Sequence, residues 1–163
     1  MRARLVPVLL CGLLGLATVA RAQVVIDRDL VTVHGQVITQ SDVWQAIDLQ
    51  LLPGVTTPAA AQRELENRVL ILAEAARLQA PAPPEDAVRA ARQAWEARAG
   101  ITDLAARLAR TGTTEAALEA WFRDTAAIDA YVERRFAGVR EADRDRARAD
   151  WIGLLRNREG LPR

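Results

Sequence analysis

Residues 25–43 of the chain read VIDRDLVTVHGQVITQSDV, and this stretch holds the most specific local pattern in the sequence. Two short runs rich in β-branched residues flank His34-Gly35, a pair that tolerates the left-handed backbone of a two-residue hairpin turn. Thr39 and Asp42 then form a capping-box pattern, in which two side chains bond to the free amides at a helix start. The stretch therefore predicts a β-hairpin that leads directly into a helix beginning near residue 40.

Helical patterns occupy the rest of the chain. We expect the first helix to end at Pro53-Gly54 and to turn one apolar face to the core, made of Val43, Trp44, Ile47 and Leu51. Proline, glycine or threonine marks most of the later boundaries. Further helices are expected at residues 58–78, 84–99, 102–112, 114–136 and 141–157. The predicted fold class is mainly α, with a short N-terminal β-hairpin and a C-terminal helix.

The N-terminal residues have the pattern of an export signal. Residues 1–4 are positively charged, and residues 5–19 form an apolar run too short and too rich in small residues for a comfortable membrane span. Ala20-Arg21-Ala22 matches a small-x-small cleavage site. We therefore predict a cleaved signal peptide over residues 1–22, export of the remainder and no stable membrane insertion. The alternative is an uncleaved N-terminal anchor.

Removal of residues 1–22 leaves 141 residues, which suits a single domain. Cys11 is the only cysteine, so the exported chain has none and forms no disulfide. Three arginines leave with the signal, and 19 basic residues then stand against 21 acidic ones. Because basic and acidic side chains alternate rather than forming a basic stripe, no nucleic-acid partner is predicted.

The sequence offers little for catalysis or cofactor binding. His34 is the only histidine and Ser41 the only serine, and each is accounted for by its place in the turn or the first helical turn. One histidine and no cysteine leave no zinc-ligand set, and the glycines form no phosphate loop. Carboxylates lie three or four residues from arginines, as in Glu64/Arg68, which is typical of solvated helical faces. No catalytic, cofactor or metal site is predicted, and the chain is not expected to be an enzyme.

The four tryptophans fall on four different expected helices. For Trp44 and Trp151 we expect core positions. Trp95 lies on a helix with little other large apolar surface, and Trp121 is next to Phe122, so the two diverge by about 100° around the helix. Trp95, Trp121 and Tyr131 are therefore our candidates for an exposed apolar surface that binds peptide, the alternative being that they fill the core.

The segment Gly35-Gln36-Val37-Ile38-Thr39-Gln40-Ser41-Asp42-Val43 resembles a motif of the SurA-like periplasmic chaperones. Asp27-Arg28, the Leu72-Ala73-Glu74-Ala75 run and residues 149–156 extend the resemblance over most of the exported chain. Two departures stand out. The family usually has asparagine at the position of His34. Full-length members also carry parvulin-type prolyl isomerase domains, for which the junction at residues 138–143 leaves no room.

The resemblance implies a SurA N-terminal-like domain at residues 23–138 and a C-terminal helix at 139–163 that packs back on it. It also implies an ATP-independent, cofactor-free chaperone of the periplasm that binds unfolded polypeptide, outer-membrane β-barrel precursors included. Trp95, Trp121 and Tyr131, chosen above from their helix positions, are the candidate contacts. One alternative is a dedicated partner-binding or assembly subunit, in which the same surface grips one folded protein or joins a homodimer. A further alternative is a residual peptidyl-prolyl isomerase.

Overall fold

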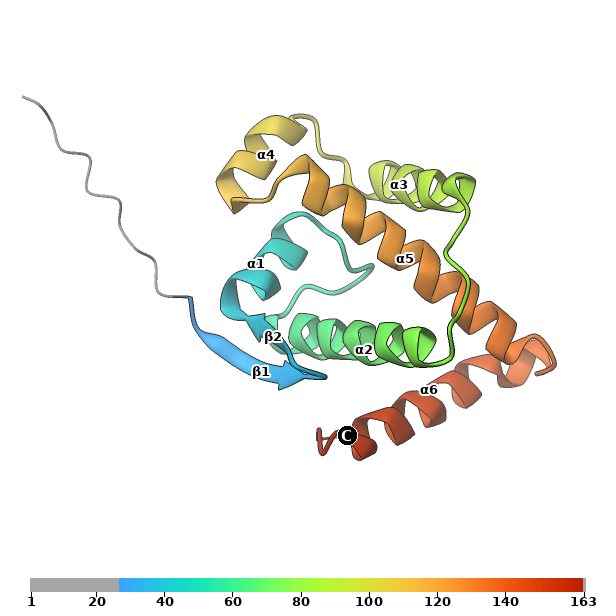
Figure 1. The fold of residues 1–163 in the computed structure, drawn as a ribbon. Coiled ribbons are helices and arrows are strands. Elements are labelled where there is room, and N and C mark those ends of the chain that lie inside the picture. Colours follow the sequence, from blue (N-terminus) through green and yellow to red (C-terminus); the bar gives the residue numbers. More distant parts are fainter. Residues whose placement is uncertain (1–26, 163) are drawn as a thin grey trace, which may run out of the picture.

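The computed structural model describes residues 27–162, which form two strands and six helices (Figure 1). In chain order these are β1 (Asp29–Val33), β2 (Gln36–Thr39), α1 (Gln40–Asp48), α2 (Pro58–Arg77), α3 (Glu85–Ala99), α4 (Leu104–Thr111), α5 (Glu115–Phe136) and α6 (Glu141–Arg158). The mainly helical fold with an N-terminal hairpin is confirmed. The predicted signal peptide, residues 1–22, lies outside the described residues.

The hairpin and the helix start agree with the sequence pattern. β1 and β2 pair antiparallel with Val33 opposite Gln36, and the turn between them has φ values of 48° at His34 and 77° at Gly35. The Thr39 N–H donates to the Asp42 Oδ2 atom at 2.8 Å, and the Asp42 N–H donates back to the Thr39 hydroxyl at 3.3 Å. The capping box is therefore complete, and α1 starts where the strand ends.

The first helix ends earlier than expected, at Asp48 rather than near Pro53. Gln50 has φ 50°, and the Leu51 N–H returns to the Ala46 carbonyl at 2.9 Å, which closes the helix with a left-handed turn. Side chains of later helices then satisfy the last carbonyls, because Arg107 donates to Asp48 (2.9 Å), Trp95 to Leu49 (2.8 Å) and Arg98 to Gln50 (3.3 Å). Long-range contacts, absent from the local pattern, thus stabilise this boundary.

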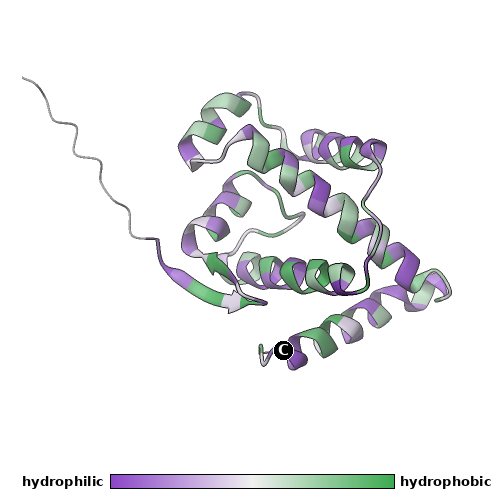
Figure 2. Ribbon diagram, in the orientation of Figure 1, coloured by the Kyte–Doolittle hydropathy of each residue, from purple (hydrophilic) through white to green (hydrophobic). Residues whose placement is uncertain are grey.

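Two hydrophobic clusters make up the core. We call the first the hairpin lobe; it joins the hairpin, α2, α6 and the second half of α5. The second, the α3–α4 lobe, joins α3, α4 and the first half of α5. Helix α5 supplies residues to both clusters, and Leu49, the residue directly after α1, belongs to the second. Figure 2 shows hydrophobic and hydrophilic segments alternating along α5, as expected for a helix that packs on part of its circumference.

Helix α6 returns across α2 and closes the hairpin lobe (Figure 1). Only residues 137–140 separate it from α5. Arg156 is 3% exposed and reaches α2, donating to the Asn67 Oδ1 atom at 3.0 Å and the Glu66 Oε2 atom at 2.7 Å. Its Nε atom donates to the Pro162 carbonyl at 2.8 Å. Among residues 27–162, no helix is both long and apolar enough to span a bilayer.

Candidate functional site

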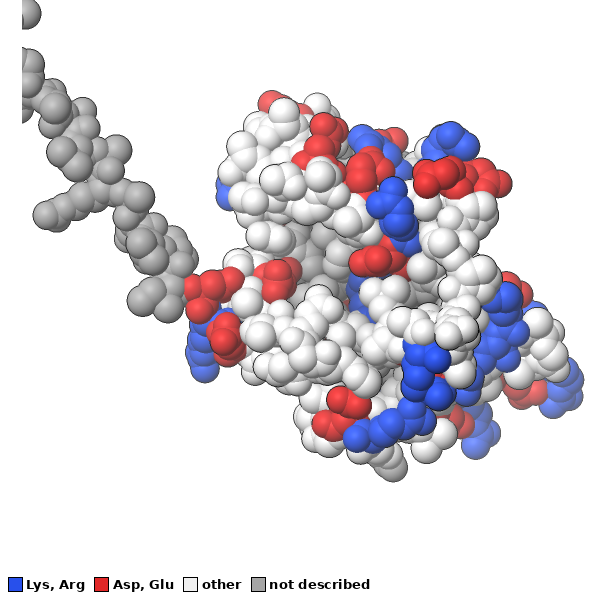
Figure 3. Space-filling view, viewed as in Figure 1, with Lys and Arg blue, Asp and Glu red and all other residues white. Residues whose placement is uncertain are grey.

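A cavity of about 440 Å³ lies between β2, α1, α2 and α5. It opens on the face seen in Figure 3, where the surface is hollowed beside α1. Most of its wall is aliphatic, with Leu65, Val69 and Leu72 from α2, Leu118 from α5 and Leu51 from the loop after α1. Aliphatic walls with a few polar groups are typical of binding sites for apolar ligands or chain segments.

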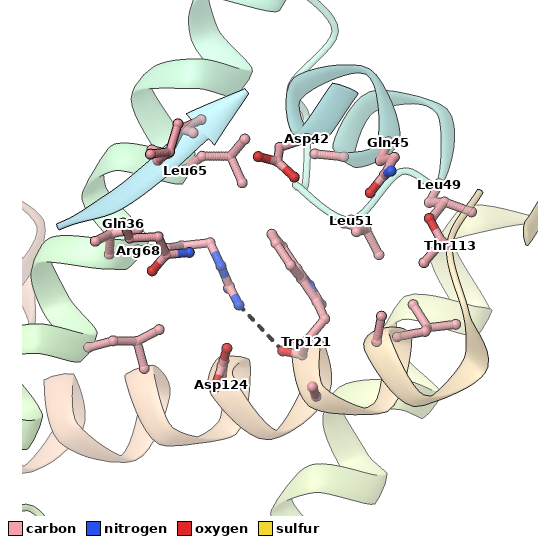
Figure 4. Close-up of a pocket in the computed structure, with 18 residues that line it drawn as sticks. Gln36, Asp42, Gln45, Leu49, Leu51, Leu65, Arg68, Thr113, Trp121 and Asp124 are labelled. Carbon is pink, nitrogen blue, oxygen red and sulfur yellow. Dashed lines mark hydrogen bonds between the residues drawn. The ribbon is translucent and has the colours of Figure 1, made fainter. Parts of the chain in front are cut away.

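Arg68 and Trp121 form the main polar feature of the cavity (Figure 4). The guanidinium carbon of Arg68 lies 3.6 Å from the centre of the Trp121 ring, in a cation–π contact. Arg68 also donates to the Trp121 carbonyl at 3.3 Å and to the Thr125 hydroxyl at 3.1 Å. Thr125 in turn donates to the Trp121 carbonyl at 2.9 Å. One ring contact and two hydrogen bonds thus hold the guanidinium against α5.

Arg68 is a half-buried cation that forms no ion pair with a carboxylate in the part of the chain described. Loss of solvent lowers its pKa to about 10, although the charges of Asp124 and Asp129 act in the opposite direction. The side chain is therefore charged at neutral pH. A guanidinium has five N–H groups, and its contacts to Trp121 and Thr125 use two of them. Three remain for a ligand.

Two carboxylates also line the cavity, and they differ in what they contact. The Asp42 carboxylate accepts from both the N–H and the hydroxyl of Thr39 at the helix cap, so it is already engaged. Desolvation raises the pKa of Asp124, against the effect of the Arg68 charge. One cation and two anions leave the lining slightly negative, which favours neutral or basic ligands over acidic ones.

The edge of β2 forms another part of the wall. Gln36, Val37 and Ile38 all line the cavity. Successive side chains of a strand point to opposite faces, so three consecutive lining residues place the cavity along the strand edge. Val37 is 41% exposed, and the sheet within the described residues contains β1 and β2 alone. This edge of β2 is therefore open to the cavity.

A second hollow of about 370 Å³ adjoins the first and shares three lining residues with it: Leu51, Arg68 and Trp121. The Arg68–Trp121 pair thus stands between the two hollows. Its side chains can contact a ligand in either one.

Of the three peptide-binding candidates, only Trp121 lines the main cavity. The expected exposure of Trp95 and Tyr131 was wrong, because they are 3% and 6% exposed. Trp95 packs on Phe122 at 5.3 Å between ring centres and donates its indole N–H to Leu49, as described above. Tyr131 packs on Trp151 at 6.0 Å. Each buries its ring and gives its polar atom a partner within the fold.

Two further expectations about single side chains need correction. Trp151 is buried as expected, but Trp44 is 52% exposed on the outer side of α1. Arg68 does not form the expected surface pair with Glu64; instead it turns into the cavity. The sequence does contain a signal for this, since Arg68 lies at helical spacing between Leu65 and Leu72 in the apolar stripe of α2.

No protein-family model, curated protein or solved structure matches this chain. The structure itself gives the remaining information on the site. Within residues 27–162, no three His, Cys, Asp or Glu side chains are grouped so that they could hold a metal ion.

Proposed function

We propose that this protein binds extended, unfolded polypeptide segments in the cavity between β2, α1, α2 and α5. The observation that carries the proposal is the Arg68–Trp121 pair, a fixed cation with spare donors in a mostly aliphatic cavity that opens to solvent. An unfolded chain offers apolar side chains to the walls and carbonyl oxygens to these donors. Both kinds of group recur along any extended chain, so such a site has no need of a particular sequence.

The sequence resemblance to the SurA-like periplasmic chaperones supports the same function. If residues 1–22 direct export, the site faces clients in the periplasm, where outer-membrane β-barrel precursors are the class that the resemblance implies. Binding would lower the free concentration of aggregation-prone chain. Release needs neither ATP nor a cofactor, because a client that folds withdraws its own apolar segments from the cavity.

The proposal is tested with the exported form, residues 23–163, added to a β-barrel precursor diluted from urea while light scattering is followed. Suppression of aggregation at near-stoichiometric ratios is expected, and Arg68→Met should weaken it. Arg63→Met is the matched control, since Arg63 is an exposed arginine on the same helix and does not line the cavity. The proposal would be refuted if folded wild-type protein failed to suppress aggregation of the precursor.

Trp44 favours a second candidate function, that of a subunit dedicated to one folded partner or to a second copy. It is a large exposed apolar side chain on the outer side of α1, and tryptophan is enriched at the centres of protein interfaces. A partner captured by the wild-type protein and lost with Trp44→Ser, while Arg68→Met still captures it, would favour this candidate.

A further inference from the structure

The backbone of β2 presents hydrogen-bonding groups to the cavity. In a hairpin with a two-residue turn, the pair next to the turn is hydrogen-bonded, here Val33 with Gln36. The following pair, Thr32 with Val37, then points its N–H and C=O groups away from the ladder. Those of Val37 lie on the edge of β2 that lines the cavity. Those of Thr32 lie on the opposite edge, along β1.

Two side chains with hydrogen-bond donors line the same cavity as this edge. Among the described residues, three N–H groups of Arg68 and the indole N–H of Trp121 donate to no acceptor. Figure 4 shows Gln36 of β2 and Arg68 of α2 lining the cavity, with Trp121 reaching in from α5. An extended chain in this cavity could pair one edge with β2 and offer the carbonyls of its other edge to these donors.

The charge of the lining decides between a carboxylate and an uncharged acceptor. A carboxylate ligand would gain the attraction of Arg68 but would lie beside Asp42 and Asp124. A peptide carbonyl gains a charge-assisted bond to Arg68 and meets no such repulsion. The occupant that fits best is therefore the uncharged backbone of an extended segment.

We infer that the cavity recognises the peptide backbone itself: a client adds a strand to β2 at Val37 and gives its outer carbonyls to Arg68 and Trp121. This inference rests on the proposed function and deepens it, because it states which atoms of the client are bound. Strand addition of this kind derives affinity from main-chain bonds and leaves only weak preferences to the side-chain pockets. Clients of many sequences could therefore bind, provided that the bound segment has an extended backbone.

The test measures binding of uncharged, end-capped nonapeptides to the exported form by fluorescence anisotropy. One peptide is apolar and unmodified, a second has the same composition in scrambled order, and a third is N-methylated through its central residues. Val37→Pro removes the N–H at the cavity edge. Thr32→Pro is its matched control, since it removes the N–H of the paired residue on the other edge, and proline is tolerated at strand edges. Arg68→Met is compared with Arg63→Met.

We expect the unmodified and scrambled peptides to bind alike. N-methylation, Val37→Pro and Arg68→Met should each weaken binding roughly tenfold, as the loss of one or two hydrogen bonds implies. Thr32→Pro and Arg63→Met should bind like the wild type, and circular dichroism confirms that each variant is folded.

Two other results would overturn the inference. If the peptides bind but scrambling abolishes binding, or if Val37→Pro and Arg68→Met match their controls, backbone recognition is wrong while the proposed function stands. If no peptide binds to folded wild-type protein, the proposed function falls, and the inference falls with it.

Discussion

The hairpin lobe and the α3–α4 lobe both bury aliphatic and aromatic side chains, but different bonds close them. In the hairpin lobe, the buried Arg156 ties α6 to Glu66 and Asn67 of α2. In the α3–α4 lobe, the buried closing contact is uncharged, the indole N–H of Trp95 on the Leu49 carbonyl. Its ion pairs, such as those of Arg92 with Glu96 and Glu119, lie nearer the surface.

The difference shows how the two lobes depend on distant parts of the chain. A buried ion pair costs desolvation and is strongly harmful when half of it is removed. An uncharged side chain that caps a helix end costs less to lose. The hairpin lobe should therefore unfold cooperatively when α6 is disturbed. Disturbance of the α3–α4 lobe should cause only local opening at the end of α1.

The largest effect is expected for Arg156→Met, which leaves the Glu66 carboxylate buried without its partner. The free energy of unfolding should fall by about 3–5 kcal/mol, measured by urea denaturation. Arg158→Met is the control on the same helix, because Arg158 is mostly exposed and lies 3.4 Å from Glu74; about 1 kcal/mol or less should be lost. Equal losses in the two variants would mean that burial of the Arg156–Glu66 pair has no special effect, and the hairpin lobe would then not differ from the α3–α4 lobe in this respect.

A smaller loss is expected for Trp95→Phe. The ring volume is largely kept, but the Leu49 carbonyl loses its donor, which costs about 1–3 kcal/mol. Hydrogen exchange should quicken at the end of α1 while α2 and α6 keep their protection. Uniform loss of protection across both lobes would contradict a local role for this bond.

The hairpin lobe should also be the acid-sensitive one. Hydrogen bonds from Arg77 hold the pKa of the buried Glu74 carboxylate below its ordinary value of 4.5, with help from the charge of Arg158. A group whose pKa is lowered by folding stabilises the fold above its unfolded pKa, and this contribution disappears as the pH falls through its folded pKa. Wild type should therefore exceed Glu74→Gln in stability at pH 7 and lose that advantage below pH 4.5. A constant difference down to pH 3 would contradict this origin.

The smallest effect is expected for Trp44→Ser on α1, whose buried residues Val43 and Ala46 belong to the hairpin lobe. Because Trp44 is largely exposed, the free energy of unfolding should change by about 0.5 kcal/mol or less. Thermal unfolding measures this. A loss comparable to that of Trp95→Phe would mean that the outer side of α1 contributes to the core after all.

Local patterns predicted the parts of the fold that depend on local contacts. The hairpin and the start of α1 followed from His34-Gly35 and the Thr39–Asp42 capping box, since these residues bond to one another or to their own backbone. The end of α1 could not be predicted in this way. It depends on donors from α3 and α4, about 46–59 residues away in the chain.

The candidate site was harder to predict, because the side toward which a helical residue turns depends on what packs beside it. Trp121 was identified by its conflict with Phe122, and it does line the cavity. The few large apolar groups on α3 predict an exposed Trp95, yet its ring packs on Phe122 and its indole N–H donates to the Leu49 carbonyl. The spacing of Arg68 from Glu64 predicts a solvent-exposed ion pair, whereas its position between Leu65 and Leu72 on α2 indicates the cavity side, where the structure places it.

Helix α5 runs through both lobes over 22 residues, with neither glycine nor proline inside it. Sharp kinks in helices nearly always need such a residue, a π-bulge or an inserted group. We therefore expect α5 to hold the two lobes at a fixed angle, so that the cavity is already open before a client arrives. Association then requires no closing step, so the observed rate of binding should rise linearly with client concentration and reach no plateau.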